Sequence, residues 1–149
     1  GGLEKDSKTG AISTNPENHD LMVRLRAEKI AKIEVPDVLV EGCADDADLL
    51  IVGFGSTYGH LYSAMKELNA KGNKVALAQF SYINPLPKNT AEVLKRYKKV
   101  VVADQNMGQL AGYLRMKIDN FAPYQFNEVK GQPFTVSALV DAFQEIINK

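Results

Sequence analysis

One segment sets the architecture of this chain: Leu49-Leu50-Ile51-Val52-Gly53-Phe54-Gly55-Ser56-Thr57-Tyr58-Gly59. Its apolar half lacks polar alternation, which is typical of a strand covered on both faces at the centre of a parallel sheet. Beyond the first glycines the apolar side chains recur at helical spacing, at Tyr58, Leu61, Tyr62, Met65 and Leu68. That spacing is typical of a helix packed on a sheet. The segment therefore predicts a strand, a glycine-rich turn and a helix.

The turn has two interpretations. Backbone N–H groups at the start of a helix can hold an anion, a phosphate or a partner's carboxylate. Glycine is equally required wherever a strand and a helix approach closely or φ is positive, and Ser56 or Thr57 then simply caps the helix. Both interpretations stay open at this stage. The candidate residues of the turn are Gly53, Gly55, Ser56, Thr57, Tyr58 and Gly59.

Several common sites do not fit this turn. The dinucleotide fingerprint G-x-G-x-x-G needs a glycine where Tyr58 stands and an acid after the next strand, where Gln79-Phe80-Ser81 stands. There is no G-K-[ST] motif for a nucleoside triphosphate. Ser56 lacks the flanking glycines of a nucleophile elbow, and a solvated capping region explains Ser56 and His60 better than a catalytic dyad does. We therefore assign no catalytic residue.

Composition narrows the function classes further. The 149 residues, of which 45% are hydrophobic, suit one substantial core. The formal net charge is zero and the longest Lys/Arg run is Lys98-Lys99, so we expect no nucleic-acid partner and no anionic membrane surface. The apolar runs are too short to cross a bilayer, and we expect a cytoplasmic protein. With a single cysteine, Cys43, and only His19 and His60, the sequence predicts no self-contained metal or iron–sulfur site.

The first residues differ in composition from the rest. Residues 1–15 are rich in Gly, Ser, Thr, Asn and charge, and we interpret them as an arm from a preceding domain, ordered only on another surface. Asn15 and Pro16 then predict a helix start, with Asn15 as the N-cap. Residues 16–149 are predicted to form one α/β domain. The chain has no initial methionine and reads as a piece of something longer.

Strands and helices alternate after the arm, which predicts a three-layer α/β domain with a mostly parallel sheet of about five strands. Strands are expected at 38–40, 49–54, 74–80, 99–104 and 121–129, the first and last of them at sheet edges. Helices are expected at 16–33, 58–71, 89–97, 110–117 and 135–147. Asn89 is interpreted as the N-cap of the helix at 89–97, and Thr135 as the N-cap of the helix at 135–147.

The carboxyl ends of parallel strands meet at one edge of such a sheet, where ligands and partners sit. Besides the glycine-rich turn, the candidate residues of that edge are Asn84, Pro85, Asn106, Gly108 and Gln109. Amides suit a contact with another backbone better than acid–base chemistry, and Met107 is of a type enriched in interfaces. We predict a docking surface at this edge. The alternative is that Met107 and Leu86 cover the end of the core.

Six short motifs occur in the order of a known family. They are Gly2-Leu3-Glu4-Lys5-Asp6, Asn15-Pro16-Glu17-Asn18-His19, Gly55-Ser56-Thr57-Tyr58-Gly59, Asn84-Pro85-Leu86-Pro87, Asn106-Met107-Gly108-Gln109-Leu110 and Lys130-Gly131-Gln132-Pro133-Phe134. Together they resemble the alpha subunit of 2-oxoacid:ferredoxin oxidoreductases, in its Rossmann-like C-terminal domain, which is similar to the C-terminal domain of transketolase. The chain departs from the family at Lys5, where histidine is expected, and at Asp104, where glutamate is expected.

The resemblance implies a role in a thiamine-diphosphate enzyme. The family oxidatively decarboxylates 2-oxoacids such as 2-oxoglutarate or pyruvate, passes electrons through an iron–sulfur cluster to ferredoxin, and releases an acyl-coenzyme A. The resemblance implies that thiamine diphosphate, magnesium, the cluster and coenzyme A belong to the parent enzyme and not to this domain. It implies three partners: a preceding pyrimidine-binding domain of the same subunit, a beta subunit and, for the parent complex, ferredoxin. The isolated domain is then expected to be a docking module without activity.

A flavodoxin-like module is the second candidate. The run Gly55-Ser56-Thr57-Tyr58-Gly59 after a strand also looks like a phosphate loop for flavin mononucleotide. Flavodoxins usually stack their flavin on aromatic side chains and are strongly acidic, whereas this chain has no Trp and no net charge. A bound flavin would make the purified protein yellow.

Overall fold

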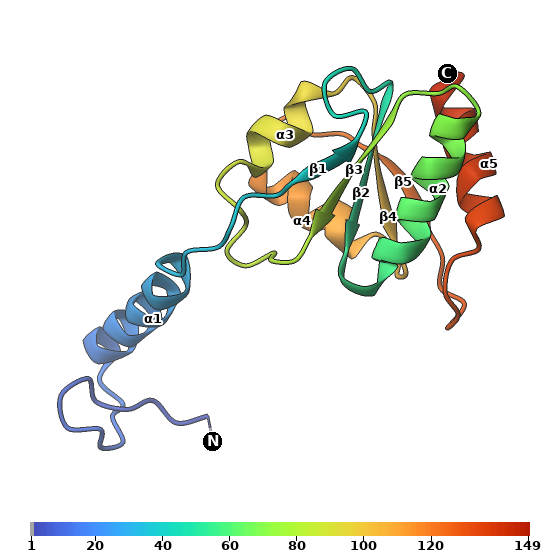
Figure 1. The fold of residues 1–149 in the computed structure, drawn as a ribbon. Helices are drawn as coiled ribbons and strands as arrows, with labels where there is room; N and C mark the ends of the chain where they lie inside the picture. The colour runs from blue at the N-terminus through green and yellow to red at the C-terminus, as the bar shows by residue number, and fades with distance from the viewer. Residues whose placement is uncertain (1) are drawn as a thin grey trace. The chain divides into compact units, whose positions relative to one another are not determined.

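The computed structural model describes residues 2–149, which form two compact units (Figure 1). The first unit comprises residues 2–35 together with 82–86, and the second comprises 36–81 and 87–149. The helix that the sequence assigned to the α/β domain lies in the first unit, together with the arm. The division into an arm at 1–15 and a domain at 16–149 stays a prediction. The origin of the arm in a preceding domain stays a prediction.

The first unit contains a hydrogen-bonded arm and one long helix. An isolated bridge joins Lys5 to Ile12, and the N–H of Asp6 donates to the carbonyl of Ala11 at 2.8 Å. Helix α1 (Pro16–Ala31) begins as predicted, because the side chain of Asn15 accepts a hydrogen bond from the N–H of Asn18 at 2.7 Å. The helix ends at Ala31, two residues before the predicted end.

The second unit carries the sheet. Its elements are β1 (Val40–Gly42), β2 (Leu49–Phe54), η1 (Gly55–Thr57), α2 (Tyr58–Ala70), β3 (Val75–Phe80), α3 (Thr90–Arg96), β4 (Val100–Asp104), α4 (Gln109–Lys117), β5 (Tyr124–Asn127) and α5 (Val136–Ile147). The strand order is β1-β3-β2-β4-β5, with β1 antiparallel to β3 and the other pairs parallel. The predicted fold class is therefore confirmed, and β2 is the central strand of the sheet.

Helices cover both faces of this sheet. Figure 1 shows α2 and α5 together on one face and α3 and α4 on the other. Leu49 and Ile51 of β2 share one buried cluster with Leu61 of α2 and Phe143 of α5, and all four are fully buried. Leu50 and Val52, which alternate with them along β2, are also fully buried, as a doubly covered parallel strand requires. None of the helices in residues 2–149 has the length and apolar character needed to span a bilayer.

Several local expectations are wrong, and the side chains explain why. The first edge strand starts at Val40 because the N–H and C=O of Val38 are bonded to the side chain of Asn89, at 3.0 and 2.9 Å. Asn89 is consequently not free to cap α3. Thr57 does not cap α2 with its hydroxyl, which instead donates to the carbonyl of Phe54 at 3.1 Å. Thr135 also makes no side-chain cap.

Candidate functional site

The glycine-rich turn after β2 is shaped by close packing and by one left-handed residue. Gly53 is buried inside β2, and a Cβ atom there would clash with the side chain of Leu61 and lie 3.0 Å from the hydroxyl of Thr57. Gly55 has φ +67°, a conformation that side chains other than glycine rarely adopt. The buried Thr57 ties the turn to the end of β2, while Ser56, Tyr58 and Gly59 are exposed.

Tyr58 is anchored at the first turn of α2. Its hydroxyl donates to Oε2 of Glu41 at 3.1 Å, and its ring lies 5.6 Å from that of Tyr62. Partial burial of the phenol and the hydrogen bond to the Glu41 carboxylate raise the pKa of Tyr58 above its ordinary value. The residue therefore stays neutral at physiological pH and presents an aromatic face beside the turn.

Gln79 closes the turn from the neighbouring strand. Parallel pairing places it opposite Gly53, and its Nε2 donates to the carbonyl of Gly55 at 2.9 Å. Among the described residues, its buried Oε1 is the side-chain polar atom that lacks a partner. The sequence placed Gln79 at the carboxyl end of a core strand, where a dinucleotide fold would carry an acid, but did not count it among the candidate site residues. The strand register, which the sequence does not give, is what brings it to the turn.

The loop after β4 is a rigid turn with one exposed apolar side chain. Oδ1 of Asn106 accepts from the N–H groups of Gly108 and Gln109, both at 2.8 Å, and Oδ2 of the buried Asp104 accepts from the N–H of Leu110 at 2.9 Å. Met107 at the tip is 87% exposed. The alternative in which Met107 covers the core is therefore wrong. We predicted that the side-chain amide of Asn106 would contact a partner's backbone. Its Oδ1 atom is instead occupied by two hydrogen bonds inside the loop.

Strand β5 adds residues that the sequence did not point to. Oε1 of Gln125 and the amide of Asn127, which are hydrogen-bonded to each other at 3.2 Å, lie against Gly108, whose φ is +92°. The loops that follow β4 and β5 meet at a further contact, in which Nε2 of Gln105 donates to the carbonyl of Gln132 at 2.9 Å. Beside this contact lies a cavity of about 310 Å³, lined by Gln105, Glu128, Gly131, Gln132 and Pro133. The carboxyl edge thus extends from the β2 turn to the loop after β5.

The other two predicted residues of the edge are in the first unit. Asn84 and Pro85 belong to the segment 82–86 of the first unit, so the described edge of the second unit does not include them. Their part in a common site stays a prediction. No three His, Cys, Asp or Glu side chains within residues 2–149 are grouped so that they could hold a metal ion.

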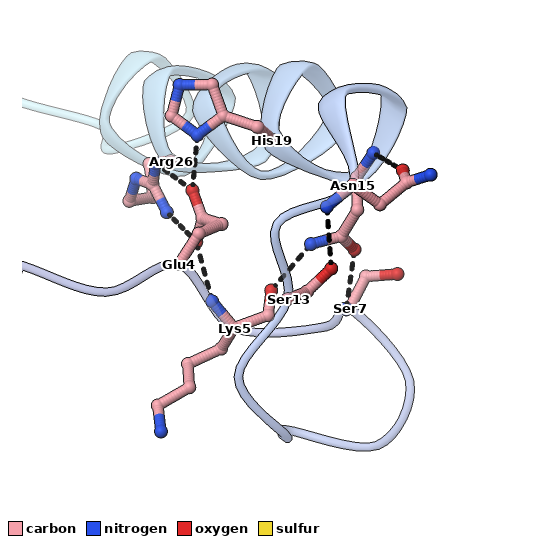
Figure 2. Close-up of polar contacts among 8 residues, drawn as sticks. Glu4, Lys5, Ser7, Ser13, Asn15, His19 and Arg26 are labelled. Carbon is pink, nitrogen blue, oxygen red and sulfur yellow. Dashed lines mark hydrogen bonds and ion pairs between the residues drawn. The ribbon is translucent and has the colours of Figure 1, made fainter.

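The first unit has a polar cluster of its own, which we call the arm clasp: Glu4, Asn18, His19 and Arg26. Figure 2 shows the Glu4 carboxylate pointing at the helix, where it accepts from Nη1 and Nη2 of Arg26 at 3.2 and 3.1 Å and contacts Nδ1 of His19 at 3.0 Å. The Arg26 hydrogen bonds, followed by the backbone N–H of Lys5, lower the pKa of Glu4 to about 2.

Asn18 completes the clasp by bonding the backbone of the arm. It is the buried residue of α1; its Nδ2 donates to the carbonyl of Lys5 at 2.8 Å, and its Oδ1 accepts from the N–H of Ser7 at 2.9 Å. The arm was expected to be ordered only on another surface, and α1 supplies that surface. Two motifs of the family resemblance, around Glu4 and around Asn18, thus have one structural purpose.

Glu4→Gln is expected to loosen the arm while leaving α2 to α5 unchanged. The charge-assisted bonds to Arg26 would be lost, so the N–H groups of Asp6 and Ser13 should exchange with solvent several-fold faster. Because the folded-state pKa of Glu4 lies below its ordinary value of 4.5, the clasp should persist above about pH 4.5 and weaken as the pH falls toward 2. Amide exchange measured by NMR checks the effect of the substitution and the effect of pH, with Glu34→Gln as the control. Unchanged exchange in Glu4→Gln would contradict the clasp.

Comparison with known proteins settles the family. Residues 47–138 match the family described as pyruvate:ferredoxin oxidoreductase core domain II. The chain belongs to this family. The matched range includes the whole glycine-rich turn and the loop after β4, so the resemblance drawn from the six motifs is confirmed. The alternative of a flavodoxin-like module finds no support in these comparisons.

The relatives of this core domain II chain are subunits of 2-oxoacid oxidoreductases. It is 51% identical over 117 residues to the 2-oxoglutarate oxidoreductase subunit KorA of Mycobacterium tuberculosis, a match that covers 78% of this chain and 18% of that protein. It is 34% identical to the 2-oxoglutarate synthase subunit KorA of Methanocaldococcus jannaschii, covering 73% of this chain and 29% of that protein. The chain therefore spans less than a third of the length of these relatives.

Solved structures agree with the sequence comparison. The 2-oxoglutarate:ferredoxin oxidoreductase of Magnetococcus marinus, solved with 2-oxoglutarate, coenzyme A and succinyl-CoA bound, matches with a TM-score of 0.80 and 30% identity, over 96% of this chain and 26% of that chain. A split-gene transketolase matches with a TM-score of 0.58 and 17% identity, over 78% of this chain and 44% of that chain, which shows a shared fold only.

Proposed function

We propose that this chain is the C-terminal domain of the alpha subunit of a thiamine-diphosphate-dependent 2-oxoacid:ferredoxin oxidoreductase. The parent enzyme would decarboxylate a 2-oxoacid oxidatively, transfer the acyl group to coenzyme A and reduce ferredoxin in the cytoplasm. The identity to KorA subunits and the likeness to an enzyme solved with 2-oxoglutarate and coenzyme A support this proposal and favour 2-oxoglutarate as the substrate.

Within that enzyme, the chain would act as a docking domain. The observation that carries this role is Met107, 87% exposed at the tip of a hydrogen-bonded loop on the carboxyl edge of the sheet. A large apolar side chain that is exposed on a hydrogen-bonded loop is suited to a protein interface, where methionine is enriched. Asp104, the last residue of β4, is the one carboxylate in that strand. It is buried and accepts a hydrogen bond from the N–H of Leu110, so it is not placed for acid–base chemistry.

The proposed partners are the preceding pyrimidine-binding domain of the same subunit and the beta subunit. The docking edge would comprise the loop residues Gly53, Gly55, Ser56, Thr57, Tyr58, Gly59, Asn106, Gly108 and Gln109, with Asn84 and Pro85 on the first unit. Magnesium and an iron–sulfur cluster do not fit the described residues, which offer one cysteine and no cluster of metal-ligating side chains. We therefore propose that these groups and thiamine diphosphate are held by other parts of the parent enzyme.

The isolated 149-residue chain is expected to be inactive. It would be assayed with 2-oxoglutarate or pyruvate, coenzyme A, thiamine diphosphate, magnesium and a viologen acceptor, after circular dichroism has shown that it is folded. The full enzyme that contains this sequence serves as the positive control and should reduce the viologen. Turnover by the isolated chain above background would contradict its assignment as a docking domain. Inactivity of the full enzyme with every 2-oxoacid would contradict the family activity instead.

A further inference from the structure

The amino end of the sheet, opposite the docking edge, carries a concentration of positive charge. The connection from α3 to β4 reads Lys95-Arg96-Tyr97-Lys98-Lys99. Arg96 is paired with Glu92 at 2.9 Å, and Nζ of Lys99 donates to the carbonyl of Ile147 at 2.6 Å. Within residues 2–149, Lys95 and Lys98 make no ion pair. Three of the four cations therefore lack an ion pair within the described residues, and one of these, Lys99, is bound to a neutral carbonyl.

These two lysines border a cavity of about 270 Å³. Two connections form its walls: the one from α3 to β4 and the one from α4 to β5. The lining residues are Leu94, Lys95, Tyr97, Lys98, Val100, Asn120, Phe121, Ala122 and Pro123, none of which is acidic. The volume lies close to the lower limit of small-molecule pockets, about 300 Å³, and far above the roughly 30 Å³ share of one water.

The walls of this cavity are fixed. Tyr97 is 8% exposed, and its hydroxyl donates to the carbonyl of Ala44 at 2.6 Å. Asn120, in the connection from α4 to β5, has φ +59°, a left-handed conformation that few residues other than glycine adopt. Pro123 is buried and precedes β5. A site with preset walls loses little freedom when it binds a ligand.

Helix stabilisation does not account for both lysines. Lys95 lies in the last turn of α3, where a cation complements the helix dipole. Lys98 lies beyond the C-cap Tyr97 and so gains little from that dipole.

We propose that this cavity binds the diphosphate group of a small organic ligand. Two ammonium groups and the amide of Asn120 supply donors for phosphate oxygens, and none of the lining residues is acidic. Phe121, half-buried in the wall, offers an apolar surface for the organic part of the ligand. The site lies at the amino ends of β4 and β5 and is independent of the docking edge.

The test is a titration of the 149-residue chain with inorganic pyrophosphate at low ionic strength, followed by amide NMR. Saturable shifts are expected at Lys95, Lys98, Asn120 and Phe121, with tighter binding of pyrophosphate than of inorganic phosphate or sulfate. The double variant Lys95→Gln/Lys98→Gln should weaken binding about tenfold or more, because charge-assisted hydrogen bonds are lost. Lys88→Gln is the control, since Lys88 is exposed, makes no ion pair in residues 2–149 and lies outside the cavity.

Three results would overturn the site. The first is the absence of saturation. The second is equal weakening by Lys88→Gln, which would indicate a diffuse counterion effect. The third is equal affinity for sulfate and pyrophosphate, which would indicate an adventitious anion only. If the double variant is found to be unfolded, the shifts of the unmodified chain decide, because their location at the four named residues is read without any substitution.

Discussion

Replacing Gly53 with valine is expected to lower the free energy of unfolding of the α/β unit by about 3 kcal/mol, the upper part of the range for overpacked cores. A Cβ atom at this position would clash with Leu61, lie 2.6 Å from Oε1 of Gln79 and lie 3.0 Å from Oγ1 of Thr57. Leu61 is fully buried, so it cannot move aside. The gain in strand propensity from a β-branched residue is at most about 1 kcal/mol and does not offset the clash.

Gly59→Ala is the matched control for this prediction. A Cβ atom at Gly59 meets nothing within 4 Å, and the residue lies in the first turn of α2. Alanine is favoured over glycine in helices by up to about 1 kcal/mol, so Gly59→Ala should leave stability unchanged or raise it slightly. The midpoints of denaturant titrations are compared for the two variants, and a shifted midpoint with an unchanged m-value reports a change in stability. An unchanged midpoint for Gly53→Val would show that β2 and α2 are not as closely packed as described.

The second large effect is expected at Met107. Replacing this side chain with aspartate in the full-length subunit should weaken its association with the other parts of the enzyme, because a partner surface would then bury an unpaired charge. Central interface residues commonly cost 2 kcal/mol or more on truncation, so a loss of at least about thirtyfold in affinity is expected. In the isolated chain the same change should be neutral, because Met107 is 87% exposed there.

The sequence predicted the β2–turn–α2 unit correctly because two strong patterns meet there. A six-residue apolar strand is followed by a stripe at helical spacing, and the strand up to Gly53 and the stripe residues Leu61, Met65 and Leu68 are buried. The caps were harder to predict because polar side chains found other partners. Asn89 is an example, since its amide bonds both backbone groups of Val38, a residue 51 positions earlier in the chain.

The candidate site was predicted in its loops but not in its contacts. For the turn at Gly53 and Gly55 the sequence left two interpretations open, an anion site or glycines required by close approach or positive φ, and the φ of +67° at Gly55 agrees with the second. Gln79 was missed as a site residue because its place beside Gly55 depends on the parallel register of β2 and β3. Lys95 and Lys98 were also missed, because the net charge of zero describes the whole chain and does not reveal a local cluster of cations.

The most direct test of the docking role compares Met107→Asp with Met116→Asp in the full-length enzyme. Both methionines are exposed, at 87% and 78%, but Met116 lies on α4 away from the loop tip. Subunit assembly would be measured by size-exclusion chromatography with light scattering, alongside the melting temperature of each variant in the isolated chain. Our account predicts that Met107→Asp dissociates the complex, that Met116→Asp does not, and that neither lowers the melting temperature of the isolated chain. A complex that stays assembled with Met107→Asp while the isolated chain melts earlier would contradict the docking role.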